Sequence, residues 1–425
     1  MTQSSTSVAI VGGGLAGLCA ARRLTDAGVG CTIFEAGDRV GGRVATDTVD
    51  GFLLDRGFQV FLTSYPEARR VLDYEGLEPH EFLSGSLVRW SGRMYTIADP
   101  WRQPLEGMKS LFTPVMRLGD ATKLARLRQD AIERTRTGAA AEPDQSTLRY
   151  LKGLGLSSEV IARFFTPFFG GVFLDSELAT SRSMFDVVFA MVATGRAALP
   201  ARGMAAIPEQ LRAGLPPDMV RTHSSVRRVG PGAVELASGE QVRASHIIVA
   251  TDAAEAASLS PIRPRVTWHG CTTIYFAADQ APFAEPVLVL NGDGLASGPV
   301  NHVAVPSNVA PSYAPPGAAL VSATVLGVPA TQESTLLEQA RQQLTGWFGP
   351  GVGAWRHLRT DRIPHALPAY RLSRAPNAGA AERVDETVFA CGDYLENPSI
   401  NGAMLSGRRA AGQVLARLGV AAAAG

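Results

Sequence analysis

Two glycine-rich segments near opposite ends of the 425-residue chain could bind phosphate through the backbone. In the first, VAIVGGGLAGL at 8–18, the residues Gly12, Gly14 and Gly17 form a GxGxxG pattern. Gly12 permits a tight turn, Gly14 lets the backbone approach a pyrophosphate, and Gly17 lets the following helix pack against the strand. The positive N-terminal end of that helix attracts phosphate. The residues expected against the phosphates are Gly12, Gly14, Leu15, Ala16 and Gly17.

The elements around this segment are predicted in the order strand, turn, helix, strand. Residues 8–11 form an apolar run typical of a buried parallel strand, a helix is expected from about 15 to 27, and a second strand at 31–34 ends at Glu35. Glu35 follows Gly17 by 18 residues, near the spacing of a ribose-binding acid. A carboxylate there repels a 2′-phosphate. NADP is therefore a poor fit, whereas NAD and FAD both remain.

A second glycine pair, in RVGGR at 39–43, lies just after this acid. Gly41 and Gly42 allow close approach of the backbone, and Arg43 could reach the charge of a pyrophosphate. With Ala36 and Arg39, these residues extend the predicted binding site beyond the first turn.

The C-terminal cluster, ACGDYLENPSINGAMLSG at 390–407, follows a short predicted strand at 388–390. The strand is closed by Gly392 and Asp393, and a helix with small residues at its start comes next. The residues expected at the ligand are Gly392, Asp393, Ile400, Asn401, Gly402 and Ala403.

The first cluster, with its acid and GGR, resembles the FAD-binding segment of the flavoprotein family that includes amine oxidases, protoporphyrinogen oxidases and phytoene desaturases. GFLLDRGFQVF at 51–61 and the GD of the C-terminal cluster also resemble that family. The resemblance implies FAD rather than NAD as cofactor. It also implies that Asp393 accepts bonds from the ribityl chain, that the C-terminal helix points at the flavin pyrimidine edge, and that Val226 and Ala250 lie near the adenine half.

The fold class implied is α/β, with a Rossmann-type, glutathione reductase-like FAD domain and an inserted α+β substrate domain. The FAD domain is expected to be discontinuous, over 1–80, 200–264 and 364–425, and the substrate domain to cover 81–199 and 265–363. Helical spacing is expected over 105–136, a loop at 137–144, and an entry helix back to the FAD domain within 198–211.

The composition sets limits on partners and location. A formal net charge of +1 gives no electrostatic case for nucleic acid. The four scattered cysteines predict neither a zinc site nor disulfides, and no metal is expected. With no signal peptide and no membrane span in the sequence, a cytoplasmic location is expected. Peripheral contact with a membrane stays open, as does the oligomeric state.

The reaction expected from the resemblance is dehydrogenation of a largely apolar small molecule by hydride transfer to the flavin, with oxygen or a quinone as acceptor. SINGAMLSG resembles the desaturase ending, and ALPAY at 366–370 resembles the protoporphyrinogen oxidase pattern. Ser399 stands where amine oxidases usually carry an aromatic residue, and no lysine follows Lys152. Asn401 replaces the family's usual acid. Amine oxidation, a redox-neutral FAD-dependent isomerase and a non-catalytic FAD-binding protein all stay open.

No residue is assigned a catalytic acid or base role. The side chains of His269, His365 and Tyr370 could reach the pocket, but a structural role is favoured for each. The pair Asp55-Arg56 is likewise interpreted as structural or flavin-adjacent. Five phenylalanines could form an aromatic wall for the substrate, although core packing is favoured: Phe164, Phe165, Phe168, Phe169 and Phe173.

Overall fold

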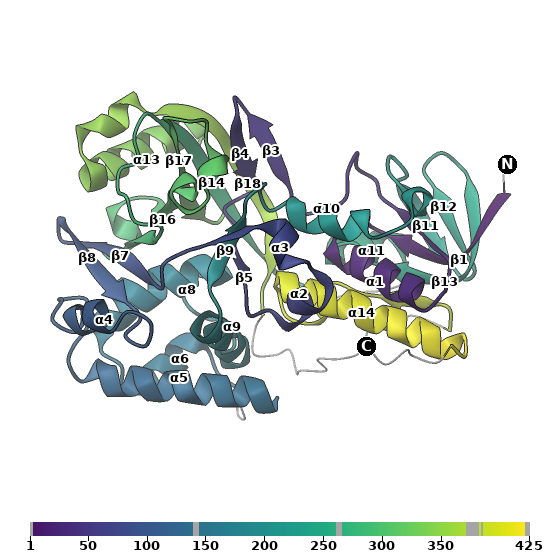
Figure 1. Cartoon of the computed structure of the whole chain (residues 1–425), viewed down its shortest axis with the longest axis horizontal. Coiled ribbons are helices and arrows are strands. Elements are labelled where there is room, and N and C mark those ends of the chain that lie inside the picture. Colours follow the sequence, from purple (N-terminus) through teal and green to yellow (C-terminus); the bar gives the residue numbers. More distant parts are fainter. Residues whose placement is uncertain (1–2, 139–143, 261–265, 371–381, 384–385, 421–425) are drawn as a thin grey trace.

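A computed structural model describes residues 3–138, 144–260, 266–370, 382–383 and 386–420. The molecule is elongated, with one β-sheet towards each end (Figure 1). The chain is α/β, as predicted. Both predicted ligand-binding segments directly follow strands of the first sheet. The second sheet contributes part of the wall of a large cavity.

The eight-stranded sheet is parallel at its centre. β1 (Gln3–Val11) pairs with β2 (Cys31–Phe34) on one side and with β13 (Gln241–Val249) on the other. β13 also pairs in parallel with β20 (Val388–Ala390), so the C-terminal segment joins the same sheet. Its other strands are β10 (Val220–Arg221), β11 (Val226–Gly230), β12 (Ala233–Leu236) and β19 (Glu382–Arg383). The carboxyl ends of β1, β13 and β20 therefore meet at one edge, where ligands bind in such sheets.

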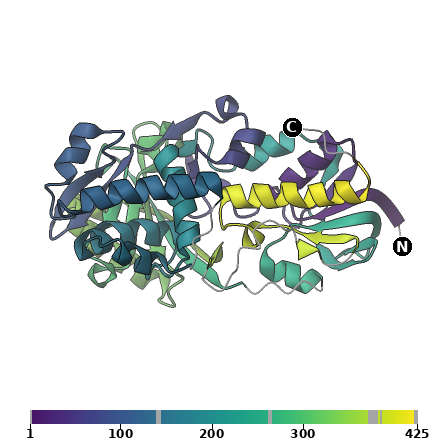
Figure 2. The same cartoon turned by 90° about the horizontal axis from the view of Figure 1, so that it is seen from below.

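Two helices from opposite ends of the chain pack against each other on this sheet: α1 (Leu15–Asp26) and α14 (Ile400–Arg417). The contact is close because glycine stands at the crossing; a Cβ on Gly407 would lie 1.9 Å from the carbonyl oxygen of Ala16. In Figure 2, α14 (yellow) runs along the half of the molecule that holds the N-terminus. Shorter helices of this half are α2 (Pro66–Val71), α3 (Tyr74–Leu77), α10 (Ala206–Ala213) and α11 (Ala253–Leu259).

The seven-stranded sheet is mainly antiparallel, with one parallel pair between β15 and β7. In spatial order its strands are β18 (Arg356–Pro368), β14 (Trp268–Ala278), β17 (Ala319–Leu326), β16 (Val300–Ala304), β15 (Leu288–Asn291), β7 (Gly85–Trp90) and β8 (Arg93–Ala98). Helix α13 (Glu333–Phe348) packs its apolar side chains with this sheet, in a cluster that includes Ile274 and Leu336.

Helix α12 (Pro306–Val309) contacts β17, and seven other helical segments form a layer near β7 and β8 (Figure 1). They are α4 (Pro104–Ser110), α5 (Asp120–Thr137), α6 (Thr147–Gly153), α7 (Ser158–Val160), the π-helical turn η1 (Ile161–Phe165), α8 (Thr166–Phe173) and α9 (Arg182–Thr194). Small sheets pair β3 (Thr46–Val49) with β4 (Phe52–Asp55), and β9 (Ala197–Pro200) with β5 (Phe61–Leu62) and β6 (Pro79–Glu81).

Two helix predictions were wrong in extent. The helical spacing over 105–136 is interrupted between α4 and α5, where Pro114 cannot continue a helix and Gly119 precedes the new start. The segment 198–211 begins as strand β9 and becomes helical only at Ala206. Of the predicted loop at 137–144, residues 139–143 lie outside the described residues.

The four cysteines, all described, are free and buried. No helix within the described ranges is long and apolar enough to cross a bilayer. Within the same ranges, no group of three or more His, Cys, Asp or Glu side chains could hold a metal ion.

Candidate active site

A cavity of about 1160 Å³ reaches from the carboxyl edge of the eight-stranded sheet to the second sheet and its helices. Most of the predicted cofactor-binding residues line it, although they come from widely separated parts of the sequence. Those at the cavity are Gly12, Gly14, Leu15, Ala16, Glu35, Ala36, Gly41, Gly42, Arg43, Val226, Ala250, Gly392, Asp393, Ile400 and Ala403.

The two N-terminal glycine segments are held together by the backbone. The Gly41 N–H donates to the carbonyl of Gly13 at 2.9 Å, and Gly14 and Gly41 form a parallel β-bridge. Gly12 has φ +106°, which only glycine adopts without strain. A Cβ added to Gly14 would have no neighbour within 4 Å, so the turn leaves open space beside the first amides of α1. This is the arrangement that a bound phosphate requires.

Glu35 is fixed by the same turn. Its carboxylate accepts one backbone hydrogen bond from Gly13 and one from Gly37, each at 2.7 Å. Each oxygen keeps a further lone pair for a ligand hydroxyl. The acid that the spacing predicted is thus oriented at the cavity before any ligand arrives.

Arg43 and Asp393 form an ion pair across the cavity edge, with Nη2 and Oδ1 2.6 Å apart. Arg43 also donates to the carbonyl of Ala366 at 3.2 Å. Burial opposes the charge on Arg43, but the Asp393 carboxylate outweighs this, so the pKa of Arg43 is raised. The residue predicted at the pyrophosphate and the residue predicted at the ribityl chain therefore orient each other.

Four predicted ligand residues do not line the cavity. Gly17 packs behind it, since its Cβ would lie 2.0 Å from the Gly12 carbonyl oxygen. Arg39 is half-exposed and ion-paired with Asp47. Asn401 Oδ1 accepts from the Glu67 N–H at 3.0 Å, which attaches α2 to α14. Gly402 lies where a Cβ would come within 1.9 Å of the Asn397 carbonyl oxygen. Their positions support the fold of the site from outside the cavity.

The N-terminus of α14 opens on the cavity. Ser399 is its N-cap, and the hydroxyl oxygen accepts from the Gly402 N–H at 2.9 Å. Ser399, Ile400 and Ala403 all line the cavity. The positive end of an 18-residue helix dipole therefore faces the cavity.

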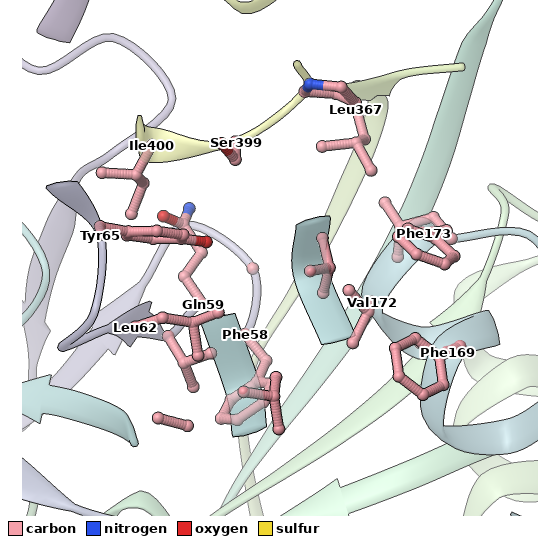
Figure 3. A pocket seen from close by; sticks show the side chains of 18 of the residues that line it. Phe58, Gln59, Leu62, Tyr65, Phe169, Val172, Phe173, Leu367, Ser399 and Ile400 are labelled. Atoms are coloured by element: carbon pink, nitrogen blue, oxygen red, sulfur yellow. The ribbon is translucent and has the colours of Figure 1, made fainter. Parts of the chain in front are cut away.

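Much of the cavity wall is apolar, and Figure 3 shows part of it. Phe58, Leu62 and Tyr65 lie on one side, and α8 presents Val172 from the other. The five predicted phenylalanines all line this part, although Phe165, Phe169 and Phe173 are also buried in a core cluster with Phe185. The favoured interpretation as core alone was incomplete. One face of the aromatic cluster is core, and the other is cavity wall.

His302 on β16 lines the cavity, although no sequence pattern had marked it as a candidate. The side-chain amide of Asn301 donates to the carbonyl of Pro167 at 2.8 Å and contacts His302 Nδ1 at 3.0 Å. Nδ1 is therefore the acceptor, which leaves the proton on Nε2. Burial lowers the pKa of His302 to about 4 and keeps the ring neutral. Nε2 has no hydrogen-bond partner among the described residues.

The sheet places Thr324 directly across from His302, in the register His302↔Thr324 between β16 and β17. Thr324 also lines the cavity, and its hydroxyl has no partner within the described chain. His302 and Thr324 thus add two neutral polar groups, side by side, to the cavity wall. Two consecutive polar residues, Asn301 and His302, inside the apolar strand VNHVA were the available signal in the sequence.

Arginines form the charged part of the apolar half. Among the lining residues of 82–128 and 164–197, the charged ones are Asp99, Arg102, Arg128 and Arg196. Arg102 and Arg128 both donate to the carbonyl of Ala193 at 2.9 Å. Burial lowers the pKa of Arg102. The neighbouring cations Arg196 and Arg128 also lower it, whereas the Asp99 carboxylate acts in the opposite direction. Arg102 lies 3.8 Å from Asp99 and Arg196 lies 3.0 Å from Glu81, so Arg128 is the one arginine of this group with no carboxylate partner among the described residues.

The three side chains considered as pocket groups do not line the cavity. His269 is half-buried in β14, His365 is exposed and stacks on Trp268 with 5.0 Å between ring centroids, and the Tyr370 carbonyl accepts from the Ser181 N–H. Asp55 is also away from the cavity. It accepts from Thr46, Met204 and Tyr313, and burial raises its pKa to about 6.

Comparison with known proteins decides the family. The profile described as flavin containing amine oxidoreductase matches residues 15–415. The chain belongs to this family. Its members are flavin-containing oxidoreductases, and FAD is the cofactor of this chain. The family assignment confirms the resemblance seen in the two glycine clusters.

Individual relatives differ in activity. The chain is 29% identical over 221 residues to a coproporphyrinogen III oxidase of Mycobacterium leprae, a match that covers 50% of this chain and 46% of that protein. It is 42% identical over 80 residues to a putrescine oxidase of Kocuria rosea, covering 19% and 17%. A solved putrescine oxidase variant superposes with a TM-score of 0.74 over 98% of this chain and 100% of that chain at 18% identity, which shows the shared fold. The sequence matches thus span about half or less of these relatives' lengths.

The described residues fit FAD. Open space at Gly14, the oriented carboxylate of Glu35 and the inward N-terminus of α14 lie along one continuous cavity. Glu35 would hold ribose hydroxyls, the turn would hold phosphate, and the flavin end would lie between α14 and the apolar half.

Proposed function

We propose that the chain dehydrogenates a largely apolar small molecule carrying an acidic group, with a porphyrinogen as the leading substrate class. Bound FAD would accept the hydride, and oxygen or a quinone would reoxidise it. We further propose the domain division expected from the sequence: 1–80, 200–264 and 364–425 hold FAD, and 81–199 with 265–363 hold the substrate.

The observation that carries this proposal is the chemistry of the apolar half of the cavity. Its wall contains aromatic side chains of α8, and its charged groups are three arginines with one carboxylate, Asp99. Asp99 lies 3.8 Å from Arg102, and Glu81 lies 3.0 Å from Arg196, so Arg128 supplies the positive charge that no carboxylate of the described residues balances. A polyamine would meet like charge here, whereas an amphipathic carboxylic acid would find counterions.

The 221-residue sequence match to a coproporphyrinogen III oxidase supports the same choice. Coproporphyrinogen III has an apolar macrocycle and carboxylate side chains, which fits an aromatic wall beside arginines. Desaturation of a neutral polyene would use the wall but would give the charge of Arg128 no partner on the substrate.

The residues of this chain would bind, orient and exclude water. The aromatic wall would hold the ring system against the flavin, and the side chains of His302 and Thr324 would orient a neutral polar group of the substrate. The helix dipole of α14 would stabilise negative charge that develops on the cofactor. No residue is assigned as acid or base.

The test is anaerobic bleaching of the FAD-loaded protein by coproporphyrinogen III, protoporphyrinogen IX, a carotene and putrescine in parallel. We expect the visible flavin bands to fall with a porphyrinogen and to return with air. Bleaching by putrescine alone, with peroxide released in air, would replace the proposal with amine oxidation.

Two further outcomes would each indicate a different role for the bound flavin. Turnover only after chemical reduction of the flavin, with no bleaching, would indicate a redox-neutral isomerase. Bound flavin that no member of the panel bleaches would leave an FAD-binding protein without this activity.

A further inference from the structure

Tyr65 brings a hydroxyl into the cavity beside the N-terminus of α14. The residue lines the cavity together with Leu62 and Ile400, and Figure 3 shows its hydroxyl directed across the cavity toward the side that Val172 lines. This hydroxyl makes no hydrogen bond within the described ranges of the chain. Because a hydroxyl in an apolar wall is normally hydrogen-bonded, the missing partner points to a bound molecule.

Neighbouring polar side chains at this end of the cavity already have partners. Gln59 Nε2 donates to the Arg43 carbonyl at 2.9 Å, and the Arg43 guanidinium is held in its ion pair. The hydroxyl of Ser399 donates to Asn397 Oδ1. Among these cavity-lining side chains, Tyr65 is therefore the one whose donor is left for a ligand.

Contacts on either side of Tyr65 fix its position relative to α14. Its N–H donates to the Leu62 carbonyl at 3.0 Å. Two residues later, the Glu67 N–H donates to Asn401 Oδ1 at 3.0 Å, and the Glu67 carboxylate accepts two bonds from Arg408, each at 2.7 Å. Asn401 and Arg408 both belong to α14, so Tyr65 and the N-terminus of that helix are held together.

The part of the ligand that fits this position is the isoalloxazine ring of FAD. Glu35 and the turn at Gly14 would hold the other end of the dinucleotide, which leaves the flavin near the N-terminus of α14, where Tyr65 lies. The carbonyl oxygens and unprotonated nitrogens of the ring accept hydrogen bonds, whereas the macrocycle of a porphyrinogen offers N–H donors. The free donor of a phenol therefore matches the cofactor.

We propose that the Tyr65 hydroxyl donates a hydrogen bond to the isoalloxazine ring and raises the reduction potential of the bound flavin. Hydride transfer adds two electrons and one proton to the ring, so its acceptor atoms become more negative and hold the donor more strongly. Tyr65 keeps its own proton throughout. Burial raises the pKa of Tyr65, so the phenol stays neutral and brings no negative charge that opposes reduction.

The test is the reduction potential of the FAD-loaded protein in wild type and Tyr65→Phe, measured by slow anaerobic reduction with dithionite beside a reference dye. The substitution removes one oxygen and keeps the ring. We expect the preference for reduced over oxidised flavin to weaken about tenfold, a fall of about 30 mV for a two-electron couple.

Tyr74→Phe is the matched control. The Tyr74 hydroxyl donates to the Thr63 carbonyl at 3.3 Å, and the residue does not line the cavity. Its removal should leave the potential at the wild-type value. The visible flavin bands should shift in Tyr65→Phe alone, because a hydrogen bond to the ring alters its electronic transitions.

Melting temperature should be the same in all three proteins, which separates an effect on the flavin from an effect on folding. An unchanged potential in Tyr65→Phe, or an equal fall in Tyr74→Phe, would overturn the proposal. If Tyr65→Phe retains flavin less well, the ratio of its dissociation constants for oxidised and reduced FAD measures the same preference. Since no substrate is present, each result is independent of the proposed reaction.

Discussion

Arg43 and Asp393 stand 350 positions apart in the sequence and 2.6 Å apart in the structure. The pair joins the GGR segment to the end of β20, at the place where both glycine clusters reach the cavity. The Asp393 side chain is 6% exposed, whereas Arg43 is 37% exposed. Each residue therefore limits where the other can lie, and both line the cavity.

Removing one partner of this pair should lower the melting temperature more than removing both charges. Arg43→Ala leaves the buried Asp393 carboxylate uncompensated, so we expect a lower melting temperature and loss of flavin on gel filtration. Arg43→Ala combined with Asp393→Asn should recover part of the melting temperature but not flavin retention. If the double variant is no more stable than the single one, the pair does not act as a unit.

Substitutions at two glycines of the first turn should affect different properties, flavin binding in one case and apoprotein stability in the other. Gly14→Val adds a side chain where no atom lies within 4 Å, in extended backbone at φ −71°. The apoprotein should keep its melting temperature but lose flavin. Gly17→Ala is the matched control, because its Cβ would lie 2.0 Å from a carbonyl oxygen. It should destabilise the apoprotein itself. Normal flavin retention in Gly14→Val would contradict the phosphate turn.

His302 should make the apoprotein sensitive to acid. Burial lowers its pKa in the folded state to about 4, whereas the unfolded imidazole titrates near 6.5. Between these values the unfolded chain binds the extra proton, so the contribution of His302 to stability is present above pH 6.5 and is lost as pH falls towards 4. The full difference is about 3 kcal/mol.

Urea unfolding of wild type and His302→Gln at several pH values measures this effect. The free energy of unfolding of wild type, relative to the variant, should fall on acidification. Asp55, with its pKa raised to about 6, contributes the opposite trend, but it is present in both proteins and cancels. A difference that does not change between about pH 7 and about pH 4.5 would show that His302 is not held neutral.

Arg128 should discriminate substrates by charge. Its guanidinium lines the cavity, and Nε has no partner among the described residues. For Arg128→Gln we expect KM for coproporphyrinogen III to rise about tenfold, with kcat nearly unchanged, because an ion pair in a buried site is lost. The methyl ester of the same substrate is the control. A parallel rise in KM for the ester would indicate lost packing rather than lost charge.

The sequence by itself determined the cofactor end of this protein. Gly12, Glu35 and the GGR segment are local signals, because a tight turn, a strand end and a helix start each require particular residues at fixed spacing. The strands at 8–11, 31–34 and 388–390 were predictable for the same reason, since short apolar runs bounded by glycine are typical of buried parallel strands.

Only the tertiary structure decided what the rest of the cavity is made of. His302 comes from β16, Arg128 from α5 and Arg196 from the residue before β9, and no local pattern links these positions. Their meeting depends on sheet register and on helix packing, which long-range contacts fix. The phenylalanines of α8 show the limit most clearly. Core packing was favoured for them, but the sequence could not show that one side of that cluster faces a cavity, because burial against side chains and burial against a ligand look alike in sequence.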